Sequence, residues 1–172
     1  MKMKISPEQK EHLEELYQYF RNNEKILNME KVPMHRGSNC YLHSFRVAKL
    51  AVHKGVQRKN VNVEVILIAS ILHDYYLYDW RKDKSKRRHH GTRHPYIAAE
   101  QAKRDFDIDE LTQKVIKSHM WPLNFSEFPR TREALFLSVA DKMIATREAL
   151  CSKKHKAKRM DEYYKKIEKL FD

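Results

Sequence analysis

Cysteine, glycine and proline are all scarce in this chain. Its 172 residues include two cysteines, three glycines and five prolines. Cys40 and Cys151 are too few and too far apart for a zinc knuckle or a disulfide framework, so we expect free thiols in a reducing, cytoplasmic location. The lack of glycine excludes the glycine-rich phosphate loops of P-loop and dinucleotide-binding folds. It also argues against a sheet rich in hairpins.

Long apolar runs are missing as well. The first twenty residues are charged throughout, which is not the pattern of a signal peptide. The longest apolar stretch, Val61–Leu72, is interrupted by polar residues and is too short to cross a bilayer. We therefore expect no membrane partner. A chain of this length can bury a core without disulfides, and we expect one domain over residues 1–172.

Acidic residues are fewer than basic ones. The chain carries 35 lysines and arginines against 23 acidic residues, a formal net charge of +12. This excess predicts an anionic partner. Two basic runs, Arg81–Arg93 and Lys153–Arg159, stand out. The first directly follows a histidine–aspartate pair, which favours an anionic small molecule such as a nucleotide over the alternative, a nucleic acid. The sequence does not indicate the oligomeric state.

What the chain does contain is helical spacing of apolar residues, in about seven segments. Ser6 with Gln9 forms a predicted capping box, and Asn62, Asp109 and Thr131 are predicted N-caps of later helices. Pro95 is expected at the first position of another helix. The sequence therefore predicts an all-α, single-domain helical bundle.

Six imidazole and carboxylate side chains lie in apolar rather than charged surroundings. They are His43, His73, Asp74, His94, His119 and Asp141. Apolar neighbours three or four positions away predict that they face inward from different helices, where bundles commonly build metal sites. A single such histidine is more often hydrogen-bonded in a core, and Asp74 alone could pair with Arg46. Six together have few ways to satisfy their polar atoms without a cation.

The residue types indicate which cations suit the site. Imidazole nitrogen and carboxylate oxygen without thiolate favour Fe, Mn, Co or Ni, with Zn or Mg also compatible. His73 and Asp74 are adjacent and differ by about 100° in direction on a helix, so both can approach one cation. The second oxygen of Asp74 can then reach another cation. Two cations about 3.5–4 Å apart are typical of phosphoester hydrolysis.

The ordered series His43, His73-Asp74 and Asp141 resembles the HD superfamily of metal-dependent phosphohydrolases, which is all-helical. The resemblance is carried by HSFRVA, ASILHD, an HP pair followed by AAE, IKSH and VADK. It covers about residues 40–150, and the predicted flanking helices, 6–30 and 156–171, lie outside it. By this resemblance the four residues hold one metal ion, with Asp74 bridging to a second.

The remaining histidines, His94 and His119, look like those that complete the second metal site in the dinuclear branch of this superfamily. That branch includes HD-GYP phosphodiesterases and diadenosine tetraphosphate hydrolases of the YqeK type. Many of its members carry a lysine three residues after the aspartate, where this chain has Leu77. The candidates to replace that positive charge are Arg46, Arg81, Lys82 and Lys142.

The resemblance and the residues together predict a metal-dependent phosphohydrolase that cleaves a phosphoester or phosphoanhydride of a nucleotide-like substrate with metal-activated water. The predicted catalytic residues are Asp74, Arg46 and Lys142, and the predicted substrate-binding residues are Arg81, Lys82, Arg93 and Trp121. Aromatic residues between 75 and 80 are candidates to stack on a base, although such residues more often pack in a core. Two alternatives remain open: an HD-type mixed-valent diiron oxygenase, and a non-catalytic, basic nucleic-acid-binding module.

Overall fold

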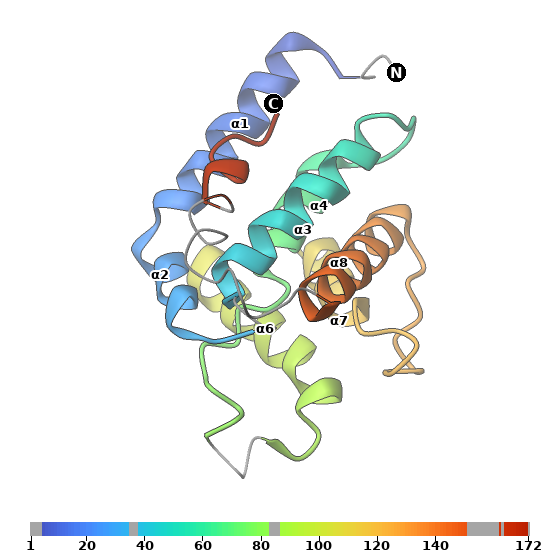
Figure 1. The fold of residues 1–172 in the computed structure, drawn as a ribbon. Coiled ribbons are helices and arrows are strands. Elements are labelled where there is room, and N and C mark those ends of the chain that lie inside the picture. The colour runs from blue at the N-terminus through green and yellow to red at the C-terminus, as the bar shows by residue number, and fades with distance from the viewer. Residues whose placement is uncertain (1–4, 35–37, 83–86, 151–161, 163, 172) are drawn as a thin grey trace.

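The chain folds into a bundle of helices (Figure 1). The computed structural model describes residues 5–34, 38–82, 87–150, 162 and 164–171. Its elements are α1 (Pro7–Asn22), α2 (Glu24–Leu27), the 3-10 helix η1 (Asn28–Lys31), α3 (Cys40–Gly55), α4 (Val63–Leu72), α6 (His90–Phe106), α7 (Glu110–Ser118) and α8 (Arg132–Leu150). These ranges contain no strand, so the prediction of an all-α fold is confirmed.

Four predicted helix starts are confirmed, each by a side chain that accepts an otherwise unpaired backbone N–H. Ser6 and Gln9 form the expected capping box of α1. Asn62 caps α4 and Asp109 caps α7. At the start of α8 the Thr131 hydroxyl accepts the N–H of Ala134 at 3.2 Å. Short polar side chains therefore mark where each of these helices begins.

Helix α3 lies at the centre of the bundle and packs against both α4 and α8. It is buried around most of its circumference, as is α4. Both helices also end within the core, α3 at Gly55 and α4 at Leu72. Helix α7 closes the arrangement by contacting α4, α6 and α8. This packing directs one face of each of these helices toward a common interior.

Two predicted boundaries are wrong. The segment 6–30 is not one helix, because Asn23 ends α1 in an extended conformation and its side chain caps α2 at the N–H of Lys25. Helix α6 begins at His90, so Pro95 lies inside it rather than at its first position. Proline lacks one hydrogen-bond donor. The carbonyl of Gly91, four residues earlier, therefore lacks its usual helical donor, although Pro95 itself is buried within the bundle.

The described C-terminal residues pack on α1 (Figure 1). Ile167 and Leu170 are buried, and the Tyr17 hydroxyl donates to the Ile167 carbonyl at 2.6 Å. Glu14 accepts the N–H of Leu170 at 3.0 Å. Most of the predicted helix 156–171, the second basic run and Cys151 lie outside the described residues. Among the helices that are described, none has the length and apolar character needed to cross a membrane.

Candidate metal centre

The six predicted ligand residues come together in the interior of the bundle. His43 lies on α3, His94 on α6 and Asp141 on α8. His73 and Asp74 directly follow α4, and His119 directly follows α7. All six are buried, with exposed fractions between 0% and 8%. Five separate stretches of chain therefore supply one cluster of imidazoles and carboxylates.

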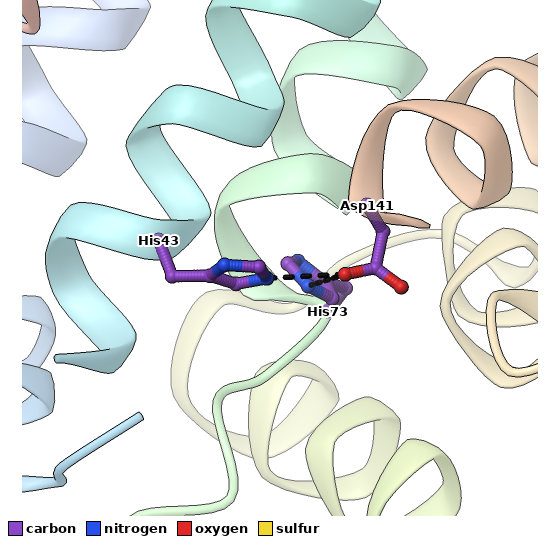
Figure 2. A group of neighbouring side chains, drawn as sticks. All are labelled: His43, His73 and Asp141. Atoms are coloured by element: carbon purple, nitrogen blue, oxygen red, sulfur yellow. Dashed lines mark hydrogen bonds and ion pairs between the residues drawn. The ribbon is translucent and has the colours of Figure 1, made fainter. Parts of the chain in front are cut away.

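One side of this cluster consists of His43, His73 and Asp141 (Figure 2). The His43 Nε2 atom lies 3.1 Å from Asp141 Oδ1. The His73 Nε2 atom lies 3.7 Å from that same oxygen. The three side chains enter from three elements and point toward one another in Figure 2. Their donor atoms could hold a single cation.

The other side consists of Asp74, His94 and His119, and Asp74 joins the two sides. Its Oδ1 lies 3.2 Å from His94 Nε2 and 3.9 Å from His119 Nε2. Its Oδ2 faces the first side, 3.3 Å from His73 Nε2. A carboxylate with one oxygen toward each side is the arrangement that a bridging ligand requires.

Each of the four histidines presents Nε2 to the cluster because its Nδ1 bonds elsewhere. His73 Nδ1 lies 2.8 Å from the Ser70 carbonyl, and His119 Nδ1 lies 2.7 Å from the Ile116 carbonyl. His94 Nδ1 lies 2.9 Å from the carbonyl of His90. A carbonyl can only accept, so each Nδ1 carries the hydrogen and the neutral ring keeps a lone pair on Nε2. Metal-binding histidines are oriented in this way.

The lone pairs show that the residues fit a metal. His94 Nε2 and His119 Nε2 lie 3.0 Å apart, and two neutral acceptors that close repel each other unless a proton or a cation lies between them. His73 Nε2 is buried and has no hydrogen-bond partner. Buried polar atoms without partners are rare in proteins and costly. The divalent cation that the histidine–aspartate series implies would satisfy these atoms.

The surroundings of His43, His73 and His119 shift the pKa values of these imidazoles in opposite directions. Burial lowers the pKa of His43, but hydrogen bonds to Asp141 and Glu148 outweigh it and raise the pKa to about 9. Burial likewise opposes protonation of His73, but the charges of Asp74 and Asp141 raise its pKa to about 10. Burial and the nearby His73 and His94 lower the pKa of His119 to about 3. Despite burial, the histidines hold the pKa of both aspartates below its usual range.

Sequence reasoning missed Glu148, which lies behind the cluster. Its Oε2 accepts from His43 Nδ1 at 2.9 Å. Its Oε1 accepts from Arg46 and from the Ser38 hydroxyl at 3.1 Å. Glu148 follows Asp141 by seven residues on α8, which places both side chains on one helix face. That spacing was the available signal.

A cleft of about 780 Å³ opens onto the cluster. Asp74, His94, His119 and Asp141 form part of its surface, and its walls are largely apolar. The basic side chains that line it are Arg81 and Lys142. The guanidinium of Arg81 lies over the Trp80 ring, 5.2 Å from its centroid, and also donates to the Met34 carbonyl. Lys142 Nζ donates to the His119 carbonyl at 2.9 Å.

The other predicted catalytic and substrate-binding residues do not line the cleft. Arg46 binds Glu148 behind His43. The Lys82 side chain is 87% exposed, with its Nζ 3.7 Å from Asp79. Arg93 is exposed on α6. Trp121 packs edge-on against Phe128. Their functional roles stay predictions.

The aromatic residues after Asp74 mainly pack. Tyr75 and Tyr76 are buried, and the Tyr75 hydroxyl donates to Asp105 at 3.0 Å. The Trp80 ring stacks on His90, a cleft residue that the sequence did not single out, with centroids 5.0 Å apart. Because these rings already contact protein, they offer little free face for a base.

The bundle, its interior histidine–aspartate cluster and the cleft above it define the class of protein. The HD domain family matches residues 40–146, which is most of the chain. The chain therefore belongs to the HD domain family, the family of metal-dependent phosphohydrolases. Comparisons with curated proteins and with solved structures found no match.

Proposed function

We propose that this HD domain protein hydrolyses a phosphoester or phosphoanhydride bond of a nucleotide-like anion, using two divalent metal ions. The observation that carries the proposal is the position of Asp74. Its two oxygens face different groups of ligands, His73 on one side and His94 on the other. A single-ion site would not need the additional imidazoles of His94 and His119. Iron, manganese, cobalt or nickel best suits the nitrogen and oxygen ligands.

The six ligand residues would hold the ions, and the remaining cleft residues would hold the substrate. When bound, divalent cations lower the pKa of a coordinated water toward neutrality and offset charge on phosphoryl oxygens. Lys142 is anchored near Asp141 by its hydrogen bond to the His119 carbonyl, so its ammonium can face an anion without moving far. Arg81 is held on Trp80 at the same cleft. The Lys142 ammonium and the Arg81 guanidinium would together orient a phosphate group over the cluster.

Burial of the cluster favours this chemistry. The ligand side chains lie in the core, where water is scarce and electrostatic interactions are stronger than at the surface. The apolar cleft walls, which include Met34, Met120 and Leu123, would contact the part of the substrate that carries no charge. Substrate identity within the nucleotide-like class depends on this apolar part.

The test is a panel of nucleotides assayed with metal-stripped protein to which Mn, Fe, Co, Ni, Zn or Mg is returned. We expect phosphate release that requires metal and that falls to background in Asp74→Ala. The matched control is Asp107→Asn, at the far end of α6, because the Asp107 side chain is 90% exposed and pairs with Lys103. Steady turnover by metal-free protein would refute the proposal.

The same experiment separates the alternative functions. Consumption of oxygen by the iron-loaded protein, without phosphate release, would indicate a diiron oxygenase. Affinity for DNA or RNA that falls steeply with salt and ignores chelators would indicate a nucleic-acid-binding module. Either result would replace the hydrolase assignment.

A further inference from the structure

The four histidines of the cluster are not supported equally. His73, His94 and His119 each direct Nδ1 to a backbone carbonyl three or four residues earlier. His43 instead directs Nδ1 to a carboxylate, that of Glu148, at 2.9 Å. A carboxylate partner makes the opposite ring nitrogen a stronger electron donor than a neutral carbonyl does. His43 is therefore the most strongly donating imidazole of the four.

Glu148 is itself fixed in place. Its side chain is 4% exposed. One carboxylate oxygen accepts hydrogen bonds from Arg46 and Ser38, and the other accepts one from His43 Nδ1. Arg46 offsets the charge that would otherwise make burial of this carboxylate unfavourable. The Glu148 carboxylate is thus held ready to orient His43 before any ligand arrives.

The two sides of the cluster also differ in charge. The side of His43 holds the Asp141 carboxylate and lies in front of Glu148, in addition to sharing Asp74. The side of His94 and His119 shares Asp74, but among the described residues the partners of its two Nδ1 atoms are backbone carbonyls. On that side the ammonium of Lys142 bonds the His119 carbonyl at 2.9 Å. A second dication therefore meets less negative charge and a nearby positive charge.

We propose that Glu148 is a positioning residue that makes the metal position at His43 the tighter of two unequal positions. The position at His94 and His119 then fills second and exchanges more readily. The proposal rests on the two-metal site proposed above and adds an order of filling to it.

The test is a titration of metal-stripped protein with Mn²⁺. Binding is measured by calorimetry and by the electron paramagnetic resonance signal of free Mn²⁺. The wild type is expected to show two steps of different affinity. Glu148→Gln should weaken the tighter step about 10- to 100-fold, the range for loss of a ligand's outer partner, and leave the weaker step unchanged. Glu133→Gln is the matched control, because Glu133 is a buried carboxylate on the same helix, and its Oε1 accepts the backbone N–H of Asn62 at 2.8 Å, away from the cluster.

A second pair of variants tests the order of filling even if Glu148→Gln does not fold. His119→Ala should keep the tight step and lose the weak one, whereas His43→Ala should lose the tight one. Two equal steps in the wild type, equal weakening of both steps in Glu148→Gln, or an unchanged tight step in folded Glu148→Gln would overturn the inference while the proposed function stands. Absence of any Mn²⁺ binding by the wild type would overturn the proposed function itself.

Discussion

The Nε2 atoms of His94 and His119 lie 3.0 Å apart, although the Nδ1 atom of each ring donates to a backbone carbonyl. In the neutral rings both facing atoms are acceptors. A cation held between them would relieve their repulsion, and only in the folded protein, since His94 lies on α6 and His119 directly follows α7. We therefore expect metal binding to be coupled to folding at this pair.

Added metal is expected to stabilise the protein against heat. At a free metal concentration a hundred times the Kd, binding contributes about 2.7 kcal/mol, which for a domain of this size raises the Tm by roughly 5–10 °C. His94→Ala should lose part of this increase. His53→Ala should keep it, because His53 is exposed on α3 and contacts Gln57 rather than the cluster. Thermal melts with Mn²⁺ and with a chelator provide the measurement, and equal melting temperatures would contradict the expectation.

Metal affinity is expected to rise with pH. The pKa values of His43 and His73, about 9 and about 10, lie above the usual 6.5. Protons must leave these rings before they bind metal, so affinity should increase about tenfold per pH unit for each proton displaced between pH 7 and 9. Titrations at pH 7 and pH 8 measure this slope, and a flat profile would count against the site.

The stability of the metal-free protein should fall with pH, whereas metal affinity should rise. A raised folded-state pKa means that protonation of His43 and His73 stabilises the fold fully below pH 6.5. This contribution is lost as the pH rises through 9 to 10. Urea unfolding of the stripped protein at pH 6.5 and at pH 9.5 should therefore give a lower free energy of unfolding at the higher pH. Saturating metal should reduce the difference.

Arg81 and Lys82 are neighbours in sequence but differ in their access to the cleft. Arg81 lines it, whereas the Lys82 side chain is 87% exposed and lies near Asp79. A hydrogen bond to a charged group contributes about 1.5–3 kcal/mol, so Arg81→Ala should raise KM at least about tenfold. Lys82→Ala should change KM by less than about threefold. Steady-state kinetics with the best substrate of the nucleotide panel measures both KM values. A larger increase in KM for Lys82→Ala than for Arg81→Ala would mean that the substrate enters elsewhere.

Gly55 allows α3 and α4 to approach closely. A Cβ atom at this position would lie 2.8 Å from Ile66 Cδ1, so the Ile66 side chain must move in Gly55→Ala. Overpacking of this kind costs about 1–3 kcal/mol, partly offset by the better helix propensity of alanine. We expect a lower free energy of unfolding in urea with unchanged metal stoichiometry. Loss of metal as well would mean that the contact also controls the position of His73.

Much of the fold was predictable because its signals are local. Ser6, Asn62, Asp109 and Thr131 each cap the helix that they were expected to cap, since a cap needs only a short polar side chain next to a periodic apolar segment. The start of α6 was not predictable in this way. It depends on tertiary contacts of His90. This ring stacks on Trp80, and its Nδ1 atom is hydrogen-bonded to the Tyr78 hydroxyl at 3.0 Å.

The gathering of the six predicted ligand residues followed from a different signal, polar side chains in apolar surroundings. Such residues must find partners in the core, and the core is shared by all helices. Glu148 was missed because a glutamate that directly follows an arginine, here Arg147, is typical of a solvated helix face, whereas α8 packs on α3 and Glu148 is buried. The sequence also did not predict which basic side chains line the cleft. Spacing alone could not separate Arg81 from Lys82 or place Arg46 behind His43.

Anomalous diffraction from a crystal grown with Mn²⁺ tests the central claim most directly, because it locates each ion independently of activity. The account predicts two anomalous peaks, one among His43, His73 and Asp141 and one beside His94 and His119, with an oxygen of Asp74 next to each. Absence of any peak among these residues, at a Mn²⁺ concentration that saturates the protein in solution, would contradict it.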